Sequence, residues 1–119
     1  MLAIKLLFSI TLLLCSVAAV AKDADFVLKN RTGYRIHEVY VAATASNKWG
    51  TNIMHTGPLR DGHYVKIVFP HGNGACNFDI KVKYDDGDVS SWKDINLCKY
   101  QTISLYWNRK AQTTRAVGE

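Results

Sequence analysis

Residues 76–87 read CNFDIKVKYDDG and carry the clearest fold signal in the sequence. Apolar or aromatic side chains occupy every second position of this stretch, at Cys76, Phe78, Ile80, Val82 and Tyr84. Polar side chains fill the positions between them, which is typical of a strand with one buried side and one solvent-facing side. The dipeptide Asp86-Gly87 favours a tight turn, so we predict a β-hairpin whose return strand covers residues 88–97.

The same alternation recurs at short intervals on both sides of this hairpin. It predicts strands over residues 26–31, 35–44, 64–69 and 102–107, with residues 53–56 as a candidate for one more short strand. Within the second of these segments the apolar phase slips, and a β-bulge near His37-Glu38 would restore it. Six or seven short strands without a helical repeat indicate an all-β fold, either an antiparallel β-sandwich or a small barrel. Of the two, we expect the small antiparallel β-sandwich.

The first 21 residues have the pattern of a signal peptide. Lys5 supplies a positive charge, residues 6–14 are almost wholly apolar, and the small residues Ala19 and Ala21 precede the expected cut. The apolar run is about 16 residues long, shorter than the roughly 20 residues of a membrane-spanning helix. We therefore expect cleavage after Ala21 and an exported product, with a retained membrane anchor as the alternative.

Cleavage there defines the remaining organisation of the chain. We expect the β-sandwich domain to cover residues 22–107. Residues 108–119 lose the alternation and carry several basic side chains, so we predict a disordered basic tail. Lipidation of Cys15 is a further alternative, disfavoured because the large side chain of Leu14 precedes it.

Two cysteines, Cys76 and Cys98, remain after the expected cleavage. An even number of cysteines in an exported domain predicts a disulfide, which would close a loop of about 23 residues and contribute roughly 3 kcal/mol. A redox function is disfavoured because the pair does not form a Cys-x-x-Cys motif.

Several short motifs follow one another along the chain after residue 21. They are Asn30-x-Thr32-Gly33, Trp49-Gly50, the C-x-x-D-I-x-V-x-Y-D-D-G pattern of residues 76–87, and Leu97-Cys98. In this order they resemble a small domain of exported bacterial proteins. The resemblance implies a periplasmic β-sandwich and transfers no catalytic residue to this chain.

The titratable residues show no spacing typical of an active site or a metal site. The histidines at positions 37, 55, 63 and 71 follow no metal-binding motif, and no nucleophile motif is present. Asp85, Asp86 and Asp88 form a weak calcium candidate, but a plain hairpin turn is the favoured interpretation. We therefore expect no cofactor, no metal and no enzymatic activity, with a small hydrolase using an unfamiliar carboxylate pair as a minor alternative.

The charge distribution bears on the class of partner. The net charge of +5 falls to +4 when the segment with Lys5 is removed, and no basic stripe alternates with aromatic residues. A nucleic-acid partner is therefore not expected, and neither is membrane attachment after cleavage.

A polar loop over residues 45–52 contains the best candidate for partner binding. Asn47, Lys48 and Trp49 place a large aromatic ring beside a positive charge, a combination suited to a protein interface. In the alternative interpretation Trp49 folds back and caps one end of the sandwich, and Trp92 is expected in the core. We expect a periplasmic inhibitor or immunity protein that neutralises an envelope-directed toxin such as a cell-wall hydrolase. The alternative is a carbohydrate- or ligand-binding envelope module.

Overall fold

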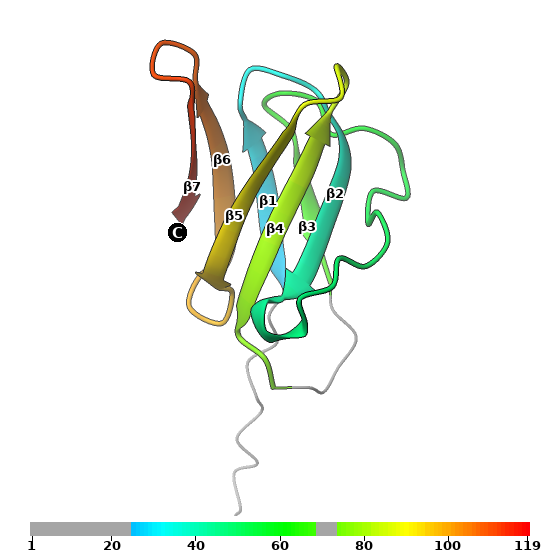
Figure 1. Cartoon of the computed structure of the whole chain (residues 1–119), viewed down its shortest axis with the longest axis vertical. Coiled ribbons are helices and arrows are strands. Elements are labelled where there is room, and N and C mark those ends of the chain that lie inside the picture. Colours follow the sequence, from blue (N-terminus) through cyan, green and yellow to red (C-terminus); the bar gives the residue numbers. More distant parts are fainter. Residues whose placement is uncertain (1–24, 69–73) are drawn as a thin grey trace, which may run out of the picture.

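The computed structural model describes residues 25–68 and 74–119, which form two β-sheets packed face to face (Figure 1). The predicted signal peptide lies outside the described residues, as does His71. In the two described ranges, no helix has the length and apolar character needed to cross a membrane.

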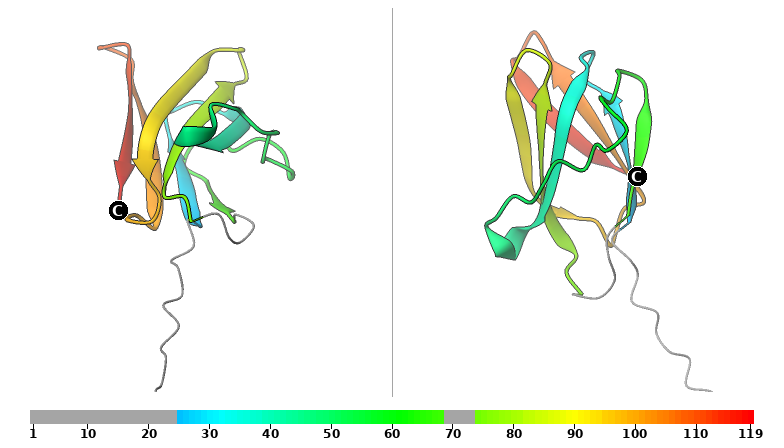
Figure 2. Two further views of the ribbon diagram at one scale, coloured as in Figure 1. Left: turned by 60° about the horizontal axis from the view of Figure 1, so that its bottom comes forward. Right: turned by 90° about the vertical axis from the view of Figure 1, so that its right-hand side faces the viewer.

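Seven strands make up the two sheets (Figure 2). The order in the first sheet is β3-β1-β6-β7, and the members are β3 (Tyr64–Ile67), β1 (Phe26–Arg31), β6 (Thr102–Asn108) and β7 (Thr113–Gly118). The order in the second sheet is β2-β4-β5, and the members are β2 (Ile36–Ala43), β4 (Asn77–Tyr84) and β5 (Val89–Asn96). A short 3-10 turn, η1 (Thr44–Ser46), follows β2. The all-β sandwich predicted from the sequence is confirmed.

The hairpin that dominates the sequence signal is the β4–β5 hairpin of the second sheet. Its inward-facing side chains on β4 are buried, while those between them are exposed or partly exposed, as the alternation predicts. The bulge expected near His37-Glu38 is confirmed, because the pairing of β2 with β4 shifts between Ile36 and Glu38.

One pair of strands departs from the predicted antiparallel arrangement. β1 and β6 run parallel, with Val27 opposite Thr102 and Arg31 opposite Tyr106. All other strand pairs are antiparallel. Apolar alternation shows which side of a strand is buried and does not show which strand lies beside it, so the sequence did not predict this pair.

The predicted disordered tail is wrong for residues 113–118, which form strand β7. These residues pair with β6, so that Thr113 lies opposite Asn108 and Gly118 lies opposite Ile103. The Glu119 N–H donates to the Thr102 carbonyl oxygen over 2.9 Å, which continues the pairing past the strand. β7 is therefore held by its backbone hydrogen bonds to β6 and not by an apolar alternation in its own sequence.

The candidate strand at residues 53–56 is also wrong. The Ile53 N–H donates to the Val39 carbonyl oxygen over 2.9 Å, but a side chain makes the neighbouring contacts and no strand forms. The Asn52 carboxamide oxygen accepts hydrogen bonds from the Val39 N–H at 3.0 Å and the Met54 N–H at 3.1 Å. This loop still contributes to the core, since Met54 and Leu59 are buried.

The core lies between the two sheets and draws on both of them. Trp92 packs against it but is only partly buried, so the sequence expectation for this residue is met in part. The buried apolar residues are Phe26, Leu28, Ile36, Val39, Met54, Leu59, Ile67, Phe78, Ile80, Val82, Tyr84, Leu97, Ile103 and Leu105.

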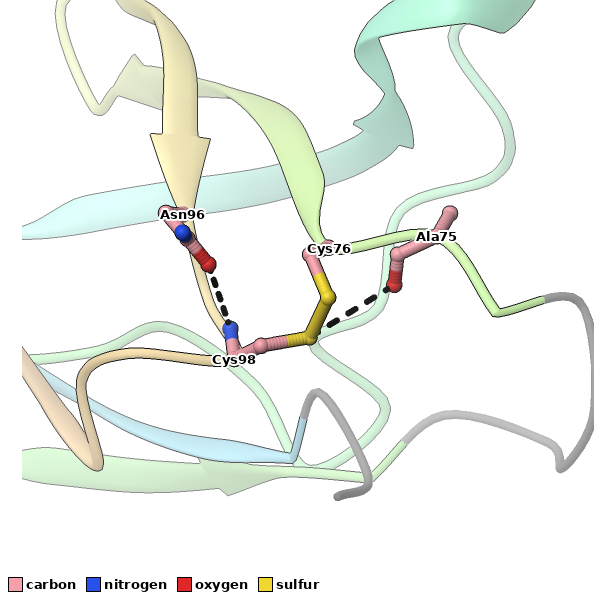
Figure 3. The surroundings of a disulfide bond; sticks show 4 residues. All are labelled: Ala75, Cys76, Asn96 and Cys98. Carbon is pink, nitrogen blue, oxygen red and sulfur yellow. Dashed lines mark hydrogen bonds between the residues drawn. A yellow bond between two sulfur atoms is a disulfide. The ribbon is translucent and has the colours of Figure 1, made fainter. Parts of the chain in front are cut away.

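The predicted disulfide between Cys76 and Cys98 is confirmed (Figure 3). It links the residue before β4 to the turn after β5, with 5.1 Å between the two Cα atoms. The Leu97 N–H also donates to the Cys76 carbonyl oxygen over 2.9 Å, and the Asn96 side chain accepts from the Cys98 N–H. The bond therefore fixes one end of the β4–β5 pair.

Candidate functional site

Three turns meet at the end of the sandwich opposite the disulfide (Figure 1). They are the β1–β2 loop at residues 32–35, the β4–β5 hairpin at 85–88 and the β6–β7 hairpin at 109–112. A cavity of about 370 Å³ lies among them, which we call the end pocket. Its lining includes three aromatic residues and three charged residues: Tyr34, Tyr84, Trp107, Asp86, Asp88 and Arg109.

Asn30 holds the β1–β2 loop in place through hydrogen bonds. Its side chain is completely buried, and its amide nitrogen donates to the carbonyl oxygens of Tyr34 at 2.7 Å and Leu59 at 3.0 Å. Its carboxamide oxygen accepts from the N–H and the hydroxyl of Thr32, at 3.1 and 2.7 Å. Because all of these bonds stay inside the protein, the backbone that carries Tyr34 is held in one position.

Tyr34 in turn connects the β6–β7 hairpin to the wall of the end pocket. The Nε and Nη2 atoms of Arg109 donate to the Tyr34 hydroxyl at 3.3 and 3.0 Å. This hydrogen bond raises the pKa of Arg109, so the guanidinium stays charged. The Tyr34 ring meets the Tyr84 ring edge to face, with centroids 6.3 Å apart. The three side chains therefore form one connected wall.

The hydroxyl of Tyr84 has unused hydrogen-bonding capacity. Tyr84 is 9% exposed, and its hydroxyl makes no hydrogen bond within the described part of the chain. Burial raises the pKa of Tyr84. The Ser90 side chain lowers it through a weak interaction with the hydroxyl that falls short of hydrogen-bond geometry, and the Asp86 charge raises it further. A buried polar group without a partner costs about 1–3 kcal/mol, so this atom favours a ligand or a local rearrangement that satisfies it.

The raised pKa of Tyr84 predicts a specific loss of stability in alkali. An unfolded tyrosine releases its proton near pH 10.0, whereas the folded protein retains the Tyr84 proton to higher pH. Stability that is present below that pH is therefore lost as the pH rises through the folded pKa. We expect Tyr84→Phe to lose less stability than the parent protein between about pH 9 and about pH 11 in urea unfolding. An equal loss in both proteins would contradict this.

The acidic hairpin is a turn rather than an assembled metal site. The Asp85 carboxylate forms an ion pair with the Arg35 Nε at 2.5 Å. The Nδ1 atom of His37 lies 3.8 Å from the same carboxylate. Asp86 instead accepts from the Asp88 N–H over 2.9 Å and closes the turn. Across residues 25–68 and 74–119, no three His, Cys, Asp or Glu side chains gather where they would hold a metal ion. The weak calcium candidate is thus not brought together.

The predicted binding loop lies on a different surface. Asn47, Lys48 and Trp49 follow η1 and are exposed, with 37% of the Trp49 surface accessible. Trp49 is not part of the core, so the interpretation in which it caps the sandwich is wrong.

The Trp49 ring is instead held against the outer side of the second sheet. The Lys81 ammonium lies 4.8 Å from the centre of the Trp49 ring and 4.7 Å from that of the Tyr40 ring. Tyr40 and Lys81 face each other on the paired strands β2 and β4. We call these three residues, together with the exposed Lys48, the lysine–aromatic patch. Cation–π contacts of this kind contribute about 0.5–1 kcal/mol each at exposed sites, which orders the Trp49 ring without burying it.

Comparison with known proteins gives evidence about the fold. No protein-family model and no curated protein matches the sequence. The structure is similar to the NMR structure of a protein from Eubacterium rectale, with a TM-score of 0.56. The match covers 82% of this chain and 88% of that chain at 11% sequence identity. At this identity the similarity shows a shared fold, and no residue role passes from one protein to the other.

The sequence did not predict the end pocket, because its residues come from three turns that are distant along the chain. Arg109 fell in the predicted tail, and Tyr34 follows a strand end without any motif of its own. Two signals were present: Tyr84 and the Asp86-Gly87 turn were both placed at the hairpin end. They could not show which other loops lie beside that hairpin.

Proposed function

We propose that this protein is an exported, non-enzymatic binding protein of the periplasm or the cell exterior. We further propose that it is an inhibitor or immunity protein which neutralises an envelope-directed toxin such as a cell-wall hydrolase. The disulfide supports export, since such bonds persist in oxidising compartments and are rare in the cytosol. A signal peptide cleaved after Ala21 is part of this proposal.

The observation that carries the proposal is the lysine–aromatic patch. Trp49 and Tyr40 offer aromatic surface, and Lys81 is fixed between the two rings. Tryptophan and tyrosine residues are enriched among the residues that dominate binding energy at protein interfaces. Enzymes that cleave glycans use paired carboxylates in a cleft, so the two lysines of the patch supply complementary charge, which the Glu38 carboxylate beside Tyr40 offsets in part.

We expect Trp49→Ala to weaken binding to the target hydrolase by about 2 kcal/mol or more while hardly changing the melting temperature. The aromatic contact surface is lost, but no core residue is touched. The measurement is calorimetric titration against a hydrolase captured from envelope extracts, combined with the inhibition of its cell-wall cleavage. Tyr64→Ala is the matched control, because Tyr64 is an aromatic residue that is 70% exposed on β3 of the other sheet.

The charge of the patch gives a second readout in the same assay. Lys48→Glu should weaken binding more at low salt than at high salt, because exposed charges are screened by ions. Unchanged inhibition by both variants would remove the patch from the interface. A stability loss of about 3–5 kcal/mol in Trp49→Ala would show that the residue has a packing role instead.

A further inference from the structure

The end pocket is a second site, formed by different elements from the lysine–aromatic patch. Its volume of about 370 Å³ falls in the range of small-molecule sites, roughly 300–1,000 Å³. It also contains the buried Tyr84 hydroxyl that makes no hydrogen bond in the described structure. Size and unmet hydrogen bonding together indicate a small polar ligand.

The charged residues of the end pocket restrict the chemistry of that ligand. The carboxylates of Asp86 and Asp88 only accept hydrogen bonds, and the Arg109 guanidinium only donates them. A free anion would meet two negative charges, and a free cation would meet the guanidinium. A neutral ligand whose groups both donate and accept suits both kinds of partner, and hydroxyl groups have this property.

The aromatic residues indicate the rest of the ligand. Tyr34, Tyr84 and Trp107 line the same cavity, where their rings can cover the C–H surface of a ring-shaped molecule. We propose that the end pocket binds an uncharged sugar residue, with its hydroxyl groups on Asp86, Asp88 and Arg109 and its C–H surface on the aromatic rings.

The pocket is prepared for such a ligand before binding. The Asn30 hydrogen bonds fix the backbone of Tyr34, and the Tyr34 hydroxyl holds Arg109 by two hydrogen bonds. Groups that are already in place lose little conformational freedom when the ligand binds. The Tyr84 hydroxyl then exchanges an unsatisfied buried state for a hydrogen bond to the sugar, which favours the bound form.

The test is an NMR titration of the ¹⁵N-labelled protein with three probes of similar size. They are methyl N-acetylglucosaminide, which is neutral, methyl glucuronide, which is anionic, and methyl glucosaminide, which is cationic. We expect the neutral probe to bind most tightly, with a millimolar dissociation constant. It should shift the backbone amide signals of residues 85–90 and 109–112, and not those around the disulfide at the other end.

Two variants test the residues of the pocket. Tyr84→Phe and Asp88→Asn should each weaken binding of the neutral probe by about tenfold, the effect of one hydrogen bond to a buried or charged group. Tyr84→Phe should keep or raise the melting temperature, because it removes an unsatisfied buried hydroxyl. Asp94→Asn is the matched control for the second variant, since Asp94 lies on β5 at the other end of the sandwich and should leave binding unchanged.

The outcomes separate this proposal from the inhibitor proposal. Trp49→Ala should leave binding of the sugar unchanged, so failure of the inhibitor proposal does not touch the pocket. The sugar proposal is overturned if the neutral probe shifts no signal in the two hairpins. Tighter binding of a charged probe, or unchanged binding in both pocket variants, would overturn it as well. If Tyr84→Phe does not fold, Asp88→Asn and Arg109→Gln decide.

Discussion

Asn30→Ala is expected to lower the free energy of unfolding by about 3–5 kcal/mol. The variant removes two hydrogen bonds that Asn30 donates to backbone carbonyls and two that it accepts from Thr32. Because Asn30 is completely buried, no water replaces it at the carbonyl oxygen of Leu59, and the partners keep their full cost of desolvation. Urea unfolding followed by fluorescence measures the change.

The matched control for this change is Asn77→Ala, an exposed asparagine at the start of β4. We expect its stability to stay within about 0.5 kcal/mol of the parent protein. Asn30→Ala should also move the NMR signals of residues 109–112, since Tyr34 holds the Arg109 side chain. A stability loss as small as that of the control would show that the buried hydrogen bonds do not hold the loop.

Removal of the disulfide in Cys76→Ala/Cys98→Ala is expected to cost about 2–5 kcal/mol. The two cysteines are separated by 22 positions, so the bond removes much of the freedom of that segment in the unfolded chain. A domain of about 100 residues has little stability to spare, and the loss is therefore a large part of the total. Differential scanning calorimetry of the oxidised parent and the double variant measures it.

Reduction of the parent protein provides the control for that experiment. Dithiothreitol should lower the melting temperature of the parent toward that of the double variant and leave the double variant itself unchanged. Equal melting temperatures of the oxidised parent and the double variant would contradict a stabilising disulfide.

The parts of the fold that the sequence predicted are those with a local cause. The strand at Asn77–Tyr84 has an apolar residue at every second position, and its turn has Asp86-Gly87. The bulge in β2 shows in the sequence as a change of phase. β7 has no such pattern, because its partner is β6 and its own side chains are mostly polar or small. The parallel β1–β6 pair is set by tertiary packing, to which local alternation does not respond.

The surfaces proposed for binding were likewise predicted only where a local sequence pattern exists. Lys48 and Trp49 were predicted because a large aromatic ring in a polar loop is visible in the sequence. The contact of Trp49 with Lys81 depends on how the loop lies against β4, more than 30 positions later in the chain. The end pocket needs three turns to meet, and Asn30 contributes to it only through buried hydrogen bonds. Local sequence patterns report none of these long-range contacts.

The parallel pairing of β1 with β6 also determines the order in which the chain can fold. The second sheet has all of its strands once Asn96 has been synthesised, and its pairs close over shorter separations. β1 ends at Arg31, whereas β6 begins only at Thr102. The contacts between these two strands therefore join residues that are among the most widely separated along the chain. Such contacts slow folding because a long loop must close before they form. A nascent chain that stops before Thr102 leaves the buried Leu28 without its parallel neighbour Ile103 and open to aggregation or proteolysis.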